Sequence, residues 1–382
     1  MLLASNLSAD LRVGILEKHQ IGLTSKFWLT NQSRLQRHAL EQCVRFTTNR
    51  ATVGTFLAPP AVATGDFAVV DEERLLRELM RRCDERGVFF SEQTEAFNFH
   101  HADSRLTVET NRGPAQTRLI VDATGGLSQI AASFRLHRII GFYSIYGAHL
   151  ENLTLASADI VGAYVLRFGD PPPLFEVIPT SSTSAFVVVF VAARRLHSPA
   201  SLKRAFEDHV RDNPFFHCRQ ARPQFTAKFG AIPIGASERR HVPGLLSCGE
   251  SAMIQSPLLG AAFNEMLDHT TLIANGVNEA FHTTTKGLVN VLVKYPLTKR
   301  VNDCLQLMLA KRLTDGSLED FESLVRFLDR LGPRRAYDLF CTSLRGGHML
   351  TALRLAFVLS RRSRFKAERS DAGPSWLKPP SE

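Results

Sequence analysis

The sequence lacks the features that mark several classes of protein. Its six cysteines are scattered through 382 residues without a CxxC pair, which argues against a disulfide framework or a structural zinc site and is typical of a reducing compartment. No uncharged apolar run approaches the roughly 18 residues of a membrane span, and the N-terminus lacks the basic lead and apolar core of a signal peptide. A hydrophobic fraction of 44% and a charged fraction of 22% exclude a disordered chain, a collagen-like repeat and a coiled coil. We therefore expect a globular, cytoplasmic protein of roughly two to three domain-sized units.

Positive charge is in surplus, with 46 lysines and arginines against 37 aspartates and glutamates, a net charge of +9. Such a surplus attracts nucleotide phosphates, acidic lipids or nucleic acid. No nucleic-acid-binding module accompanies it, so we expect no nucleic-acid partner. In residues 349–366 an apolar helical face is followed by the basic residues Arg361, Arg362, Arg364 and Lys366. This pattern is typical of a helix in peripheral contact with an anionic membrane. A helix docked on the protein body with a solvated basic end is the simpler alternative.

The order of the predicted elements indicates an α/β fold. Residues 70–87 carry apolar side chains at helical spacing and end at Gly87, which favours a helix with a glycine cap. Buried strands are expected at 11–16, 118–121 and 245–248, and further helices at 200–213 and 260–275. The run AFVVVFVA at 185–192 lacks alternation, as expected of a strand covered on both faces. From residue 282 the pattern is helical, and residues 370–382, with three prolines, are expected to form a disordered tail.

Three short segments suggest how a nucleotide cofactor is held. In the first, a strand ends in Glu17 followed by Lys18, and an acidic residue at such a strand end can accept hydrogen bonds from ribose hydroxyls. In the second, the buried strand 118–121 runs into Asp-Ala-Thr-Gly-Gly from Asp122, where Gly125 permits a turn with positive φ and the close approach of a cofactor. Each segment also has a plain structural interpretation, as a solvated strand end and as an ordinary turn.

The third segment is the most specific of the three. A strand ends before Gly249 and Glu250, and a loop with Pro257 and Gly260 then leads into a helix. The N-terminus of that helix presents unpaired N–H groups and a partial positive charge, which suit a phosphate or an electron-rich ring edge.

The order and spacing of these segments resemble the flavoprotein hydroxylase superfamily, and within it most closely the branch of lycopene cyclases and geranylgeranyl reductases. The resemblance covers most of residues 8–280. It implies an FAD cofactor, with Glu17 at the adenosine ribose and Lys18 beside it, Asp122 to Gly125 near the cofactor cleft, Gly249 and Glu250 at the ribityl chain, and Pro257 and Gly260 beside the isoalloxazine ring. It is also compatible with NAD(P)H as the electron donor.

The sequence departs from this pattern in three places. The family opens with a glycine-rich turn for the FAD pyrophosphate about 20 residues before the acidic ribose ligand, and counting back from Glu17 places that turn before the first residue. Glu250 stands where the family has aspartate, and Ala262 replaces a glycine of the loop. The strand at 185–192 has none of the carboxylates that lycopene cyclases carry there. Glu176 is the nearest acid, and an ordinary strand-edge residue is its simpler interpretation.

These observations predict an α/β protein with a Rossmann-like FAD-binding domain, incomplete at its N-terminus, formed by residues 1–135 and 228–282. An antiparallel-sheet substrate domain is inserted at 136–227, a helical region follows at 283–369, and the tail occupies 370–382. The expected function is an FAD-dependent oxidoreductase, acting as a monooxygenase, reductase or cyclase-like enzyme on a hydrophobic substrate of isoprenoid or polyketide type. The alternative is a truncated, non-catalytic relative that has lost flavin binding and binds a ligand or a partner. No catalytic residue, metal ligand or oligomeric state is predicted.

Overall fold

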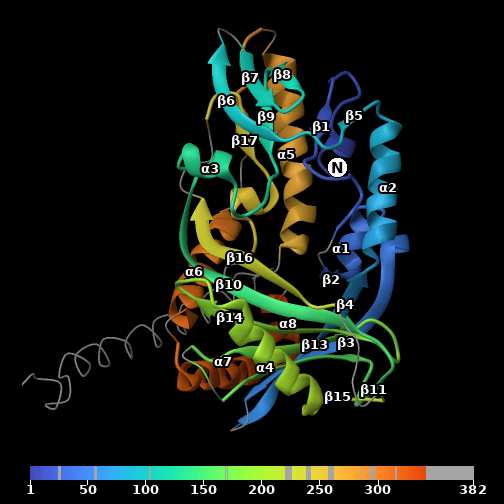
Figure 1. Ribbon diagram of the computed structural model, residues 1–382, viewed down its shortest axis with the longest axis vertical. Coiled ribbons are helices and arrows are strands. Elements are labelled where there is room, and N and C mark those ends of the chain that lie inside the picture. Colours follow the sequence, from blue (N-terminus) through green and yellow to red (C-terminus); the bar gives the residue numbers. More distant parts are fainter. Residues whose placement is uncertain are drawn as a thin grey trace, which may run out of the picture.

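A curled sheet of eight strands forms the lower half of the molecule in Figure 1. The computed structural model describes residues 1–340 apart from 25–26, 56–57, 103–104, 168, 170, 220–225, 238–241, 257–261, 285, 292, 294–296 and 315. The strand order is β16-β10-β14-β13-β12-β3-β4-β2, and all neighbours are antiparallel except β12 and β3. These strands are β2 (Leu29–Asn31), β3 (Val44–Thr55), β4 (Ala58–Val70), β10 (His137–Leu150), β12 (Ile160–Val165), β13 (Leu174–Pro179), β14 (Ala185–Ala193) and β16 (Lys228–Ser237).

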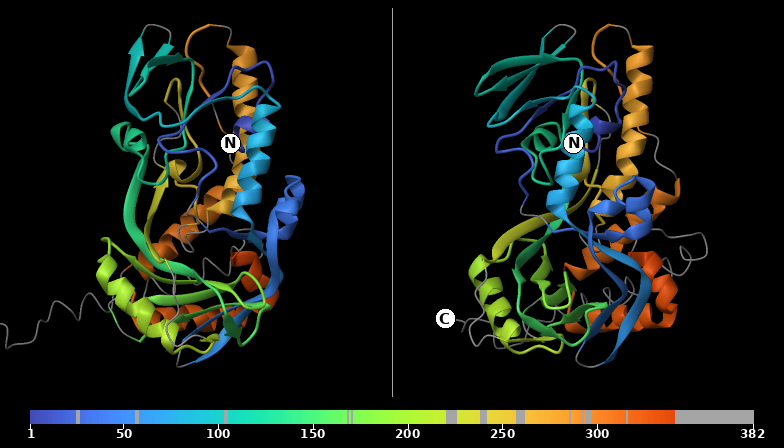
Figure 2. Two further views of the ribbon diagram at one scale, coloured as in Figure 1. Left: turned by 45° about the vertical axis from the view of Figure 1, so that its right-hand side comes forward. Right: turned by 90° about the vertical axis from the view of Figure 1, so that its right-hand side faces the viewer.

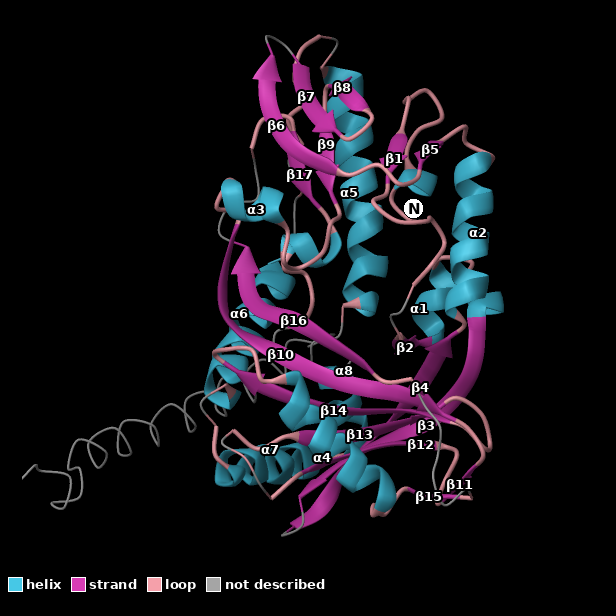
Figure 3. Ribbon diagram, viewed as in Figure 1, coloured by secondary structure: helices cyan, strands magenta, loops and turns pink. Residues whose placement is uncertain are grey.

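Helices cover both faces of this sheet (Figure 3). On one face, Leu202 and Phe206 of α4 share an apolar cluster with Val187 of β14. On the opposite face, Ala192 of β14 packs in a cluster with Ala310 of α6. The strand β14 is therefore covered from both sides, which confirms the prediction made from its unbroken apolar run. The helices around the sheet are α1 (Gln32–Arg37), α4 (Pro199–Arg211), α6 (Leu297–Leu313), α7 (Leu318–Leu331) and α8 (Pro333–Phe340).

The upper half contains parallel strands in two separate pairs (Figure 2). One pair is β1 (Gly14–Leu16) with β5 (Phe89–Ser91), and the other is β9 (Ile120–Asp122) with β17 (Leu245–Ser247). The long helix α5 joins the two pairs, because its Ile273 and Val277 lie in one apolar cluster with Leu246 of β17 and with Val13, next to β1. The helices and strands of this half also include α2 (Glu72–Asp84), β6 (Ala96–Ala102), β7 (Arg105–Thr110), β8 (Gly113–Thr117), α3 (Gln129–Ser133) and α5 (Phe263–Thr283). A small strand pair, β11 (Leu153–Leu155) with β15 (Phe216–Cys218), lies at the lower end of the molecule.

The helix α2 shows how local sequence sets an element. The side chain of Asp71 accepts a hydrogen bond from the Arg74 N–H at 3.0 Å, so it caps the first turn. Leu75 and Leu79 are buried on one side, and Gly87 follows the helix with a φ of 66°. The helix expected at 70–87 is therefore confirmed, with ends that differ by a few residues.

The hairpin of β3 and β4 was not predicted from the sequence, although it supplies two of the longest strands of the large sheet. In the upper half, the short 3-10 helix Ala4–Asn6 and β1 precede Glu17. No helix in the described part of the chain is long and apolar enough to cross a membrane. The basic segment 349–366 and the predicted tail 370–382 lie outside the described residues, and the predicted domain limits stay predictions.

Candidate cofactor site

The segment that begins at Asp122 forms a tightly bonded turn after β9. The carboxylate of Asp122, a residue only 1% exposed, accepts hydrogen bonds from the Thr124 N–H at 3.0 Å and the Thr124 hydroxyl at 2.7 Å. It also accepts one from the Ser128 hydroxyl at 2.6 Å, and Ser128 in turn caps α3. The side chain of Asp122 therefore fixes the shape of the turn, and its proximity to a cofactor stays a prediction.

Gly125 and Glu250 lie next to each other on two adjacent turns. Because β9 and β17 are parallel, with Asp122 paired to Ser247, the turns that follow them share one edge of the strand pair. Gly125 has a φ of 97° and Gly249 a φ of 68°, a conformation that residues with a side chain rarely adopt. A Cβ atom at Gly125 would lie 3.9 Å from Oε2 of Glu250, and among the described residues beyond its chain neighbours no other atom lies within 4 Å. Bare backbone and a carboxylate thus border the same space.

Glu17 and Lys18 lie where β1 ends. The backbone N–H of Glu17 donates to Ser91 at 3.0 Å and extends the pairing with β5, and Oε1 of Glu17 accepts a hydrogen bond from the His19 N–H at 2.9 Å. The ammonium of Lys18 lies 2.5 Å from the carboxylate of Glu95, and both side chains are about half exposed. Lys18 therefore forms an ion pair with Glu95 at the surface. Glu17 lies directly after the end of β1, as the sequence predicts.

Pro257 and Gly260 lie outside the described residues, but the helix to which they lead is described. Ala262 is the N-cap of α5 and has no side chain that could accept the first N–H groups. Asn264, in the first turn, accepts a hydrogen bond from the Thr30 hydroxyl at 2.5 Å. The start of α5 is therefore fixed against β2 of the large sheet.

Cys248 follows β17 and precedes Gly249. Burial raises the pKa of the Cys248 thiol to about 11, so the thiol stays protonated and unreactive at neutral pH. Within the described residues, no group of three or more histidine, cysteine, aspartate or glutamate side chains is placed to hold a metal ion.

Glu176 occupies a position that sequence reasoning interpreted wrongly. It lies on β13 between β12 and β14, inside the sheet, and it is paired with Ala163 and Val188. It is therefore a central residue and not one at a strand edge. Burial raises the pKa of the Glu176 carboxyl to about 7. The sequence did hold a signal for this central position, because Glu176 lies within LFEVIP, where the residues on either side of it are apolar.

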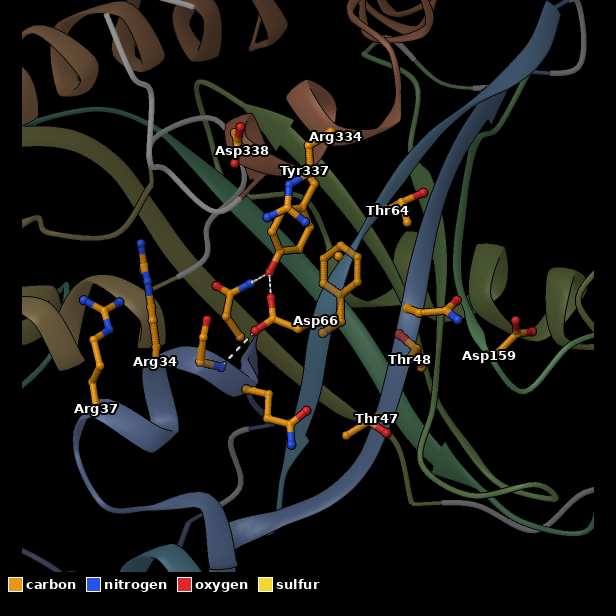
Figure 4. Close-up of a pocket in the computed structure, with 16 residues that line it drawn as sticks. Arg34, Arg37, Thr47, Thr48, Thr64, Asp66, Asp159, Arg334, Tyr337 and Asp338 are labelled. Carbon is orange, nitrogen blue, oxygen red and sulfur yellow. Dashed lines mark hydrogen bonds between the residues drawn. The ribbon is translucent and has the colours of Figure 1, made fainter.

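The sequence analysis also missed a cavity of about 920 Å³ (Figure 4). It is formed by residues of the β3–β4 hairpin, α1 and α8, with polar side chains from all three. Its residues are too far apart in the sequence to form a motif, since Asn31 and Tyr337, which share a hydrogen bond, are separated by 306 positions.

No protein-family model and no curated protein matches the sequence. Solved structures match over most of its length. A geranylgeranyl bacteriochlorophyll reductase-like protein from Thermoplasma acidophilum matches with a TM-score of 0.73 and 14% identity, over 92% of this chain and 91% of that chain. Halogenase PltM in complex with FAD matches with a TM-score of 0.65 and 13% identity, over 96% of this chain and 90% of that chain. PqsL, a probable FAD-dependent monooxygenase from Pseudomonas aeruginosa, matches with a TM-score of 0.59 and 16% identity, over 85% of this chain and 95% of that chain.

These similarities confirm the α/β fold class, with Rossmann-like flavoproteins as neighbours. At such low identity they concern the fold. The chain therefore has the fold of FAD-dependent oxidoreductases that include reductase-like proteins, halogenases and monooxygenases.

Proposed function

We propose that the chain binds FAD at the ends of β9 and β17 and acts as an FAD-dependent oxidoreductase. The observation that supports this most is the adjacent placement of the two turns, with Gly125 bare and the Glu250 carboxylate beside it. A carboxylate accepts hydrogen bonds from the hydroxyls of a ribityl chain, and a glycine backbone allows a flat ring to approach closely. The side chains of these turns fit that part of the cofactor.

In this proposal, each of the three segments holds one part of FAD. Glu17 accepts hydrogen bonds from the adenosine ribose, Glu250 from the ribityl chain, and the loop from Pro257 to Gly260 lies beside the ring, as the resemblance implies. When bound, FAD supplies hydride or oxygen transfer, with NAD(P)H as the proposed electron donor. The protein orients the cofactor and substrate and excludes water from them.

We further propose a hydrophobic substrate of isoprenoid or polyketide type. Aromatic side chains on the sheet face opposite α4 support this choice. The rings of Phe27 and Phe186 stack with centroids 4.5 Å apart, in a cluster with Ile178 and with Tyr337 of α8. Phe27 and Phe186, two partly buried members of this cluster, give that face of the sheet an apolar border for a hydrophobic substrate.

One structural observation favours the alternative, a relative that has lost flavin binding. The parallel strands do not form one continuous sheet in the described residues, because β1–β5 and β9–β17 are separate pairs. Under this alternative, the fold is kept for binding a ligand or a partner.

FAD retention distinguishes the two functions. The chain is expressed alone and with the codons that lie upstream of Met1 in the same reading frame, and the absorbance spectrum of each purified protein is recorded. We expect a yellow protein, and we expect Glu250→Ala to weaken FAD binding by about tenfold or more because a hydrogen bond to a charged acceptor is lost. Glu279→Ala, on the exposed side of α5, is the matched control. Colourless protein from both expressions, with no FAD bound on titration, would contradict the enzyme proposal.

A further inference from the structure

The face of the large sheet opposite α4 is partly exposed along its central strands. Figure 2 shows α4 on one side of the sheet and the C-terminal helices on the other. On β13 and β14 the residues that face α4, such as Phe175 and Val187, are fully buried. Four residues of these strands that face the other way are only partly buried: Leu174, Glu176, Phe186 and Phe190. Solvent therefore reaches the middle of this face, although α6 and α8 cover parts of it.

Glu176 is the acidic residue among these four. Its neighbours across the strands are Ala163 and Val188, so apolar side chains flank it on both sides within the sheet. Along its own strand, Leu174 packs with α6 and α7, whereas Ile178 packs with α8. Glu176 therefore lies between two groups of helices, where the covering of this face is incomplete.

The carboxyl of Glu176 has its hydrogen-bonding capacity in reserve. In the described part of the chain no hydrogen bond or ion pair to it is found, and burial alone raises its pKa to about 7. A protonated carboxyl has an O–H that donates a hydrogen bond. A polar group without a partner is unfavourable among apolar side chains. Glu176 therefore offers a hydrogen-bond donor to a ligand that lies against this face.

The segment before Pro257 is attached to elements on the same side of the sheet. The hydroxyl of Ser256 donates a hydrogen bond to Gln306 of α6 at 2.5 Å. The side chain of Gln255 donates one to the Pro233 carbonyl of β16 at 2.9 Å. The helix α6 packs on the face that carries Glu176. The loop that the resemblance places beside the isoalloxazine ring therefore starts at this face.

From these observations we propose that Glu176 donates a hydrogen bond to a carbonyl oxygen of an otherwise apolar substrate that lies against this face. The inference rests on the proposed function, because it assigns a polar contact to the hydrophobic substrate proposed there. A carbonyl only accepts hydrogen bonds, so its contact with Glu176 leaves no donor of the substrate unpaired among apolar side chains. The substrate class is thereby narrowed to apolar ketones and aldehydes.

Aromatic rings stand on both sides of Glu176 for the hydrocarbon part of the substrate. On the neighbouring strand, Phe186 pairs with Ile178 and Phe190 pairs with Leu174, so the two rings flank Glu176 diagonally. Each of them is only partly buried and offers an apolar surface to the substrate. An isoprenoid ketone and an aromatic ketone of polyketide type share this chemistry, and the test below separates them.

Binding is measured on the full chain by calorimetry with geranylacetone as the isoprenoid ketone and 1-tetralone as the aromatic one. At about pH 6 we expect at least one ketone to bind at millimolar concentration or better. Glu176→Leu removes the donor but keeps the bulk, and it should weaken this binding about threefold to tenfold. Glu176→Gln keeps an N–H donor and should bind equally at about pH 6 and about pH 8.5, whereas the natural protein should lose about threefold or more at the higher pH, where its carboxyl is ionised. Glu279→Leu, on the exposed side of α5, is the matched control and should leave binding unchanged.

The ketone that binds more tightly identifies the type of substrate. Absence of binding by both ketones would overturn the proposal, and so would binding that is as strong in Glu176→Leu as in the natural protein. FAD content is measured in the same preparations. Colourless protein whose ketone binding depends on Glu176 would count against the proposed function alone, and yellow protein whose ketone binding is absent or independent of Glu176 would count against this inference alone.

Discussion

Replacement of Glu176 by glutamine should remove a pH-dependent loss of stability. The carboxyl of Glu176 lies on a central strand between Ala163 and Val188, and within the described part of the chain no ion pair or hydrogen bond to it is found. The side chain is partly buried, so a carboxylate there loses much of its contact with water without a compensating charge. The protonated form is therefore favoured in the folded protein, and burial raises the pKa of Glu176 to about 7.

The size of the effect follows from the difference between that pKa and the ordinary value of 4.5. At about 1.4 kcal/mol per pKa unit, the shift corresponds to an upper limit of about 3 kcal/mol, which is reduced where solvent reaches the side chain. The folded state binds the proton more tightly than the unfolded state. The free energy of unfolding therefore falls as the pH rises from about 4.5 to about 7, and the loss is complete above that range.

Urea unfolding, followed by tryptophan fluorescence between about pH 5 and pH 8, measures this effect. We expect Glu176→Gln to unfold at nearly the same urea concentration as the natural protein at the acid end of the range. At the alkaline end it should be more stable by as much as about 3 kcal/mol, because glutamine stays neutral. Glu279→Gln, on the exposed side of α5, should show no such divergence. If the free energies of unfolding of Glu176→Gln and the natural protein differed by the same amount at every pH, the reasoning would be refuted.

Three further substitutions test the contacts around the cavity and the turn after β9. Tyr337→Phe removes the hydroxyl that donates to Asp66. It should lower the free energy of unfolding by about 1 to 2 kcal/mol at neutral pH, and by less in acid, because the Asp66 carboxyl is protonated there. An equal loss at both pH values would count against this contact. Gly65→Ala places a methyl group on the Tyr337 ring and should cost about 1 to 3 kcal/mol in a thermal melt. Gly230→Ala should be tolerated, because no atom of the described residues would lie within 4 Å of its Cβ. Asp122→Ala removes the acceptor of three hydrogen bonds and should cost about 2 to 4 kcal/mol, and unchanged amide exchange in that turn would argue that the bonds do not hold it.

Elements with local signals were predictable from the sequence. The helix α2 has a cap, an apolar face and a terminal glycine, and β14 has an unbroken apolar run, so both were expected at nearly the observed positions. The turn at Gly125 was also expected, because a positive φ angle favours glycine. In each case the residues that determine the element lie within it or within a few positions of it in the sequence.

The β3–β4 hairpin and the cavity depend on contacts between distant residues. The hairpin contains prolines, glycines and several register shifts, which break the alternation that marks a strand. The bond between Asn31 and Tyr337 joins residues 306 positions apart, so no local pattern in the sequence indicates it. Glu176 was misjudged for the same reason, since its position inside the sheet is set by strand order and not by the residues next to it.

The division of the parallel strands into two pairs has a consequence for how the protein opens. In the described residues each pair has only one ladder of hydrogen bonds, whereas most strands of the large sheet have neighbours on both sides. Packing therefore carries much of the stability of both pairs: β9–β17 packs on α5, and Ile15 of β1 and Phe90 of β5 pack with Cys83 of α2. Segments with few protected N–H groups open locally at a lower free energy than the core. In hydrogen exchange, the amides of β1, β5, β9 and β17 should thus exchange as a group ahead of β13 and β14, so the proposed cofactor-binding half forms a less stable cooperative unit than the sheet below it.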